Sequence, residues 1–194
     1  EGTYSYQWQI DNAGVWEDIT GATAATYQPA ALMTTTMYRL VATDFCDVIE
    51  TNAVTITVYD EFMASIAADQ TICYNTVPAE LTSTLTGGEG TYSYQWQIDN
   101  AGVWEDITGA TAATYQPAAL MTTTMYRLVA TDYCDVIETN AVTITVYDEF
   151  MASIAADQTI CYNIVPAELT STLTGGEGTY SYQWQIDNAG VWED

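Results

Sequence analysis

The chain repeats itself with a period of 88 residues. The stretch EGTYSYQWQIDNAGVWED begins three times, at Glu1, Glu89 and Glu177. When the chain is aligned with itself at this spacing, only two pairs of positions differ, Phe45 with Tyr133 and Thr76 with Ile164. Solenoid repeats are shorter, roughly 20–50 residues, so this period suits a small domain that folds by itself. The sequence therefore predicts a tandem array of small domains.

The repeat boundary is expected where one alternating strand ends and another begins. Val142–Tyr147 alternates as a strand does, and a new strand is expected shortly after Met151. No Gly-, Ser- or Pro-rich linker intervenes, which favours a stiff, rod-like array. We therefore predict the later part of a preceding domain at 1–60, a complete domain at 61–148 and the opening part of a following domain at 149–194. The predicted junction residues are Asp60, Glu61, Phe62, Met63, Asp148, Glu149, Phe150 and Met151, with Phe150 and Met151 plugging the interface.

Alternation of apolar and polar residues predicts an all-β fold. Tyr92, Tyr94, Trp96 and Ile98 alternate with polar residues, and the turn chemistry of Asp99–Gly102 follows. The expected strands are Met63–Ala67, Glu80–Leu85, Thr91–Ile98, Val103–Ile107, Ala113–Tyr115, Thr124–Thr131, Val136–Glu138 and Asn140–Tyr147. About seven strands with frequent turns favour an immunoglobulin-like β-sandwich. The predicted core residues are Tyr94, Trp96, Trp104, Tyr126, Leu128, Val142 and Ile144.

Charge and residue inventory exclude several functions. The chain carries 26 acidic residues against two basic ones, Arg39 and Arg127, for a formal charge of −24. Such a charge repels nucleic acids and anionic membranes. The absence of His and Lys removes imidazole bases, Schiff bases and most catalytic pairs, so we expect no enzyme activity. No apolar run approaches the roughly 20 residues of a membrane span, so no membrane insertion is expected.

Two cysteines occur in each repeat, and they are Cys46, Cys73, Cys134 and Cys161. They form no CxxC spacing, which disfavours a zinc site. Two cysteines in an acidic β-domain favour a disulfide formed in an oxidising compartment. Buried free thiols are the alternative.

Acidic residues near the predicted junctions offer a candidate calcium site. Calcium takes six to eight oxygen ligands, which carboxylates from two domains could supply in part. The candidates are Asp60, Glu61, Asp69, Asp148, Glu149 and Asp157. No D-x-D-x-D loop is present, so solvated surface acids are the favoured interpretation and no cofactor is expected.

Two further features have both a functional and a structural interpretation. Arg127 is the single basic residue of its repeat, and we expect it to pair with a carboxylate rather than grip a ligand. Trp104, Tyr92 and Tyr115 could form an aromatic platform for sugars, although core packing is the favoured role for Trp104.

Four motifs resemble one known family. They are TICYNTVPAEL at Thr71–Leu81, GGEGTYSYQWQ at Gly87–Gln97, WEDITGATAATYQPAAL at Trp104–Leu120 and YRLVATDYC at Tyr126–Cys134. Together they resemble the immunoglobulin-like repeats of giant Bacteroidota surface proteins, including SprB-type gliding adhesins. The resemblance covers the whole repeat and implies type IX secretion, anchoring at the outer cell surface and a role as a long stalk or adhesin.

The resemblance also implies a disulfide pattern. It pairs Cys73 with Cys134 and leaves Cys46 and Cys161 to partners beyond this sequence. A Cys46–Cys73 bond is the competing pairing, and it would staple adjacent domains together.

The leading expectation from the sequence is a structural one. Disulfide-stapled sandwiches would repeat into an extracellular fibre on a bacterial cell surface, with neighbouring repeats of the same chain as partners and other chains as further partners in a filament. The alternative is that every repeat binds a surface glycan or protein weakly and gains strength by avidity. An exposed, contiguous aromatic patch on every repeat would favour this alternative.

Overall fold

A computed structural model describes residues 4–194. These residues form strands, turns and loops, and contain no helix that is long and apolar enough to cross a bilayer. The chain divides into two compact units. The first holds the described residues through Met63 together with Leu85–Tyr92 and Asp132–Asp135. The second holds Ala64–Thr84, Ser93–Thr131 and Val136–Asp194.

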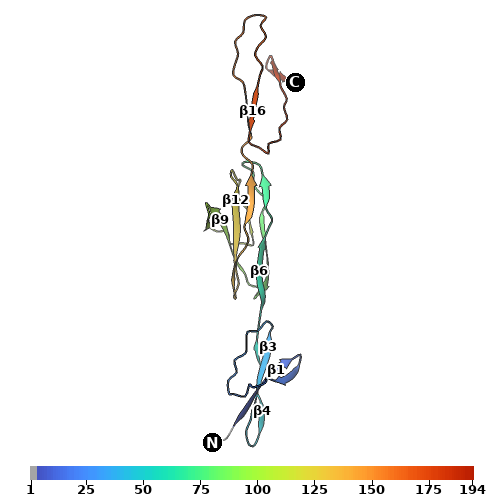
Figure 1. Cartoon of the computed structure of the whole chain (residues 1–194), viewed down its shortest axis with the longest axis vertical. Coiled ribbons are helices and arrows are strands. Elements are labelled where there is room, and N and C mark those ends of the chain that lie inside the picture. The colour runs from blue at the N-terminus through green and yellow to red at the C-terminus, as the bar shows by residue number, and fades with distance from the viewer. Residues whose placement is uncertain (1–3) are drawn as a thin grey trace. The chain divides into compact units, whose positions relative to one another are not determined.

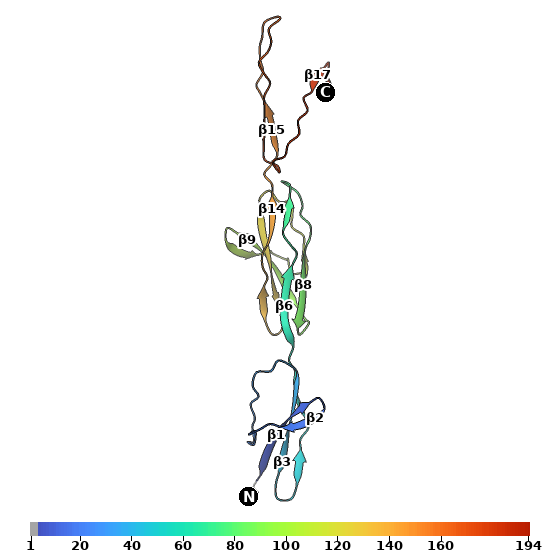
Figure 2. The same ribbon diagram turned by 45° about the vertical axis from the view of Figure 1, so that its right-hand side comes forward.

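The central 88-residue repeat contains a two-sheet sandwich (Figure 1 and Figure 2). Its larger sheet has the strand order β10-β9-β12-β14-β7, and β13 also pairs with β12. Its smaller sheet has the order β11-β8-β6. The strands are β6 (Asp60–Ile66), β7 (Gln70–Ile72), β8 (Leu81–Gly88), β9 (Ser93–Asn100), β10 (Val103–Asp106), β11 (Thr114–Tyr115), β12 (Thr124–Thr131), β13 (Val136–Glu138) and β14 (Val142–Val146). This arrangement of short strands in two sheets is an immunoglobulin-like sandwich, as the alternation predicted.

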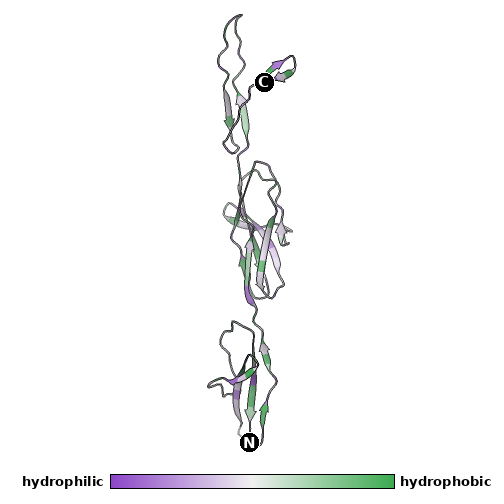
Figure 3. Ribbon diagram, turned by 90° about the vertical axis from the view of Figure 1, so that its right-hand side faces the viewer, coloured by the Kyte–Doolittle hydropathy of each residue, from purple (hydrophilic) through white to green (hydrophobic). Residues whose placement is uncertain are grey.

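The core forms where β9, β12 and β14 turn their apolar faces inward. Trp96 of β9 pairs in register with Leu128 of β12, and both are completely buried. Tyr126 and Val142 form another cross-strand pair and are 2% and 1% exposed. The smaller sheet contributes Leu81 of β8, which is also completely buried. Figure 3 shows hydrophobic and hydrophilic residues following one another along the strands, as a half-buried sheet requires.

Burial in this core shifts one titration. Tyr126 lies under Tyr115, with ring centroids 5.8 Å apart. Burial, with a smaller contribution from the neighbouring Tyr115, raises the pKa of Tyr126 to about 12. The phenol therefore stays neutral at and around neutral pH.

One strand was not predicted from the sequence. β7 is three residues long and pairs parallel to β14, with Ile72 opposite Val146. The peptide N–H of Tyr147 extends the ladder by donating to the carbonyl of Ile72 over 3.0 Å. The Asp69 carboxylate accepts a 2.7 Å bond from the N–H of Thr143 and so fixes the start of the pairing. A three-residue strand is too short for alternation to reveal it.

Trp104 differs from its predicted place in the core. The register of β10 on β9 sets Trp104 opposite Asp99, and therefore on the same face as Gln97. Trp96, one residue before Gln97, points into the core. Trp104 is half-buried on the outer face of the sheet instead. Tyr94, also predicted for the core, is half-buried.

The flanking segments repeat parts of this architecture. The earlier segment contains β1 (Ser5–Asn12), β2 (Val15–Asp18), β3 (Thr36–Thr43), β4 (Val48–Glu50) and β5 (Val54–Ile56), paired in the order β2-β1-β3-β4, with β5 also on β3. The later segment contains two hairpins, β15 (Met151–Ile154) with β16 (Ser171–Thr174) and β17 (Ile186–Asn188) with β18 (Val191–Glu193).

Candidate functional site

The outer face of the larger sheet carries one arginine held by three neighbours. Arg127 donates from Nε to the Gln97 side-chain oxygen over 2.7 Å. Its two terminal nitrogens donate to both Glu138 oxygens, over 2.6 and 3.1 Å. The guanidinium carbon lies 4.7 Å from the centre of the Trp104 ring. We call these four residues the arginine cluster.

The earlier segment builds the same cluster from its own copy of the sequence. Arg39 bonds to Gln9 over 2.7 Å and to Glu50 over 2.6 and 3.1 Å, and it lies 4.6 Å from the Trp16 ring centre. Each arginine thus uses all three of its nitrogens within its own sheet. A bidentate carboxylate and a stacked indole are the partners that suit a guanidinium. The cluster fits a structural role, as the sequence suggested, rather than a ligand grip.

We expect Trp104 and Arg127 to stabilise each other modestly. In a double-mutant cycle of Trp104→Ala and Arg127→Met, the coupling free energy should be about 0.5–1 kcal/mol, because both side chains remain partly accessible to solvent. Glu138→Gln should cost no more than about 1 kcal/mol, since 57% of the Glu138 side chain is exposed. Urea unfolding at low and high salt measures both quantities.

A mismatched cycle provides the control for this prediction. Arg127→Met combined with Trp16→Ala joins residues that belong to different clusters, and their effects should add within about 0.5 kcal/mol. An equal coupling in the matched and mismatched cycles would contradict a direct contact.

The candidate sugar platform is not assembled. Trp104 lies beneath Arg127, as described above. Tyr115 packs between the core residues Trp96 and Tyr126, at centroid distances of 6.2 and 5.8 Å. Tyr92 stacks on Phe62 at 5.4 Å with an interplanar angle of 13°. The three rings therefore serve three separate contacts.

The predicted junction residues meet a glycine pair. The Cα of Gly87 approaches the chain so closely that a Cβ there would lie 1.9 Å from the carbonyl oxygen of Glu61. Phe62, next along the chain, is 6% exposed and lies on Tyr92, whose hydroxyl donates to the Gly87 carbonyl over 2.7 Å. Phe62 thus packs within its own 88-residue repeat, while Met63 is 57% exposed. We call Glu61, Phe62, Gly87 and Tyr92 the bracket.

The later segment contains an equivalent bracket. A Cβ on Gly175 would lie 1.9 Å from the Glu149 carbonyl oxygen, and the N–H of Gly176 donates to the Asp148 carbonyl over 2.9 Å. Phe150 stacks on Tyr180 at 5.6 Å, and the Tyr180 hydroxyl donates to Gly175 over 2.7 Å. The same local geometry therefore follows both predicted repeat boundaries. Phe150 is 57% and Met151 58% exposed.

Asp132 holds a turn against the glycine pair beside the bracket, and the sequence did not predict this role. One of its carboxylate oxygens accepts 2.8 Å bonds from the N–H groups of Cys134 and Asp135, and the other accepts a 3.1 Å bond from that of Glu89. A Cβ on Gly88 would lie 1.8 Å from the carboxylate. Burial opposes ionisation, but the bonds from Asp135, Glu89 and Cys134 together hold the pKa of Asp132 below its usual value. The Asp-x-Cys-Asp spelling was the available signal for such a turn.

Asp132→Asn should lower the melting temperature at pH 7, and the difference from the parent chain should vanish in acid. The folded-state pKa of Asp132 is depressed, so its stabilisation is complete above the unfolded value near 3.8 and is lost as the pH falls through the folded value. Melting temperatures measured from pH 7 down to pH 2 test this. Asp148→Asn removes one charge at an exposed position and is the matched control. Its melting temperature should equal that of the parent chain throughout this pH range.

The candidate calcium ligands do not converge. Among residues 4–194, no three His, Cys, Asp or Glu side chains are grouped so that they could hold a metal ion. Asp69 instead accepts the Thr143 bond described above. Asp60, Glu61, Asp148, Glu149 and Asp157 are exposed.

All four cysteines are free, exposed thiols in the structure. Cys73 directly follows β7, whereas Cys134 lies in the turn between β12 and β13 and belongs to the other compact unit. None of the four cysteines forms a disulfide in the part of the chain that the structure describes. Exposure also separates these thiols from the buried free thiols that were the alternative.

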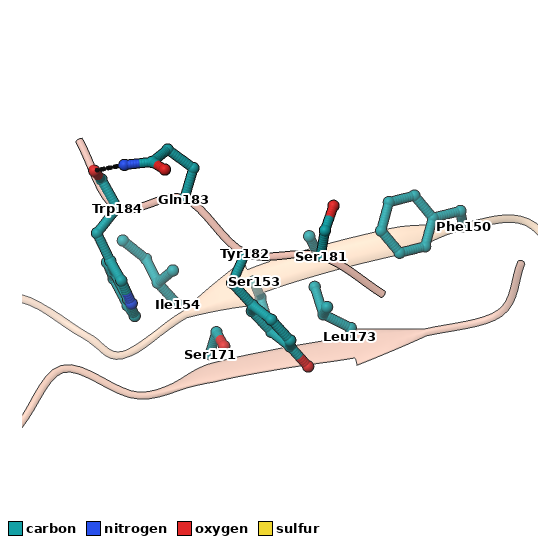
Figure 4. A pocket seen from close by; sticks show the side chains of 10 residues that line it. Phe150, Ser153, Ile154, Ser171, Leu173, Ser181, Tyr182, Gln183 and Trp184 are labelled. Atoms are coloured by element: carbon teal, nitrogen blue, oxygen red, sulfur yellow. Dashed lines mark hydrogen bonds between the residues drawn. The ribbon is translucent and has the colours of Figure 1, made fainter. Parts of the chain in front are cut away.

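A hollow in the later segment is an open core. It is lined by Phe150, Ala152, Ser153, Ile154, Ser171, Leu173, Ser181, Tyr182, Gln183 and Trp184 (Figure 4). Trp184 is 48% exposed there, whereas its equivalent Trp96 is completely buried. Phe62, the counterpart of Phe150, is also buried in the central repeat. The hollow thus corresponds to core positions of the central repeat, and we assign it no ligand.

Comparison with known proteins finds similar folds at low sequence identity. The N-terminal four immunoglobulin domains of Dscam1 isoform 6.9 share 16% identity at a TM-score of 0.41, with 74% of this chain and 38% of that chain covered. The fibronectin(III)-like modules of Clostridium thermocellum CbhA share 16% identity at a TM-score of 0.30, with 72% and 76% covered. This chain thus spans well under half of the Dscam1 fragment. A search of curated proteins gives no significant match. A family model described as a domain of unknown function (DUF8696) matches residues 1–60 and 63–148.

Proposed function

Because the chain belongs to the DUF8696 domain family, we propose that this family's 88-residue repeat is a stalk segment of a large secreted bacterial surface adhesin. The repeat would give reach and stiffness for attachment or gliding. Neighbouring repeats of the same chain are its first partners, and other chains in a filament are further ones. The location would be the outside of a Bacteroidota cell, reached by type IX secretion.

The observation that carries this proposal is the bracket. Only residues 57–59 connect β5 to β6, and only residues 147–150 connect β14 to β15. A backbone carbonyl at each connection lies against a glycine. Glu61, in β6 just after the first connection, lies against Gly87, and Glu149, within the second connection, lies against Gly175. Short connections with packed backbone have few conformations, which favours a stiff array. We propose repeat boundaries near Glu61 and Glu149 on the same ground.

Charge and chemistry support a passive role. A formal charge of −24 discourages lateral clumping of fibres. The arginine cluster satisfies the only two basic side chains of the chain within their own sheets. A disulfide within or between domains would add strength outside the cell.

Small-angle X-ray scattering of arrays that continue the period for two, four and eight repeats tests the proposal. The maximum dimension should rise linearly with repeat number. A matched control inserts a six-residue Gly-Ser linker between Tyr147 and Asp148 of every repeat, and its dimension should rise roughly as the square root of repeat number. The same square-root rise in the unmodified arrays would refute the stalk proposal.

The same arrays separate the stalk from a repeated binding module. Binding to surface glycans or proteins that strengthens steeply with repeat number would favour the binding module. We expect none, because the aromatic rings of each repeat are engaged separately.

A further inference from the structure

We propose that Cys73 forms a disulfide with the cysteine that occupies the Cys134 position in the next repeat of a longer array. The bond would lock consecutive repeats together across their junction instead of closing a loop within one repeat. The proposed disulfide is independent of the function of the array, because it requires only that the 88-residue period continues.

Cys73 lies at the end of the central repeat from which the chain continues into the following repeat. Ile72 pairs with Val146, and the Ile72 carbonyl accepts the N–H of Tyr147 over 3.0 Å. Cys73 therefore lies beside the chain just before the Asp148–Phe150 connection. It lines a hollow of about 340 Å³ with residues of the following repeat, which are Phe150, Gly176, Glu177, Thr179, Tyr180 and Ser181.

The Cys134 turn lies at the opening of its own repeat. Asp132 lies against Gly88 and accepts the N–H of Glu89, and the same carboxylate accepts the N–H of Cys134. The turn that carries Cys134 is thereby fixed on the glycine pair. Gly176 and Glu177 are the next repeat's counterparts of Gly88 and Glu89.

In a longer array, Cys73 and the cysteine at the Cys134 position of the next repeat would therefore lie at the same hollow. The glycine pair of the later segment keeps the geometry of the central one, with Gly175 on Glu149 as Gly87 lies on Glu61. A continued repeat would therefore set its own aspartate–cysteine turn on Gly176 and Glu177. These two residues line the hollow that Cys73 also lines. Within residues 4–194 neither cysteine of this kind has its partner, which accounts for four free thiols.

The bond forms by a balanced oxidation. Each thiol loses a proton, and the pair gives two electrons to a disulfide oxidant, such as oxidised glutathione or a thiol oxidoreductase, whose own disulfide is reduced to two thiols. The S–S bond of the protein replaces the two S–H bonds.

The chain's composition provides a direct assay. Because lysine is absent, trypsin cleaves only after Arg39 and Arg127, so Cys46 and Cys73 fall in one fragment and Cys134 and Cys161 in the next. We would extend the chain after Asp194 with a copy of residues 107–148, oxidise it with glutathione disulfide, isolate the monomer and digest it without reduction. The copied arginine places the copied cysteine in a third cysteine-containing fragment, at the end of the extended chain.

We expect fragment 40–127 to be linked to the fragment that carries the copied cysteine, with the loss of two titratable thiols. Cys73→Ser should abolish the link, whereas Cys161→Ser should leave it intact, and circular dichroism should show that both variants fold. In the unextended chain, fragments 40–127 and 128–194 should separate without reduction. A link between those two fragments, or an extended chain that keeps all its thiols under oxidation, would overturn the proposal.

Discussion

Trp96→Ala should destabilise the central repeat by about 3–5 kcal/mol, the largest effect that we expect from any single side-chain truncation in this chain. Trp96 is completely buried, pairs with the equally buried Leu128 and donates from its indole nitrogen to the Ala112 carbonyl over 3.0 Å. Truncation removes the apolar contacts, leaves a cavity and loses that hydrogen bond. Guanidinium unfolding followed by circular dichroism measures the loss.

The repeat supplies a matched control for this substitution. Trp184 occupies the same position in the later segment but is 48% exposed. Trp184→Ala should therefore change the free energy of unfolding by less than about 1 kcal/mol. Equal effects of the two substitutions would show that sequence position, rather than burial, determines the cost.

Gly87→Ala should cost roughly 2–5 kcal/mol, since two penalties add. Gly87 has a φ of +74°, which an L-residue with a Cβ adopts only under strain. Its Cβ would also lie 1.9 Å from the Glu61 carbonyl oxygen, which belongs to the backbone and cannot rotate away. The strand that opens the central repeat would have to move. Thermal melts and urea unfolding of the full chain measure the loss.

Gly109→Ala isolates the conformational part of that cost. Gly109 has nearly the same φ, +78°, but a Cβ there meets nothing within 4 Å. It should cost only about 1–2 kcal/mol, the strain of the left-handed conformation alone. If Gly87→Ala cost no more than Gly109→Ala, the close approach to Glu61 would carry no energetic weight.

Alternation along single strands predicted most of the sandwich. The strand Thr124–Thr131 has the bounds expected from the alternation of Tyr126, Leu128 and Ala130, since every second side chain is buried. Hairpin chemistry likewise predicted the turn between β9 and β10, where Ala101 and Gly102 have positive φ. Local patterns reveal local structure.

The features that escaped prediction depend on contacts distant in sequence. Trp104 fits either face of a strand, and only its register opposite Asp99 decides which. A Cβ at Gly87 would lie closest to the backbone of Glu61, which is distant in sequence. Asp132 is held partly by the N–H of Glu89, 43 residues earlier. Nothing in the neighbouring letters specifies such partners.

The parallel pairing of β7 with β14 determines how a pull along the chain would load the central repeat. Force enters near the start of this repeat and leaves through the end of β14, so the two parallel strands are drawn in opposite directions along their length. Their ladder, from Gln70 opposite Ile144 to Ile72 opposite Val146, is then sheared as a whole. Several hydrogen bonds must break together, whereas a peeled hairpin loses them one at a time. A three-residue strand can thus act as the mechanical latch of its repeat.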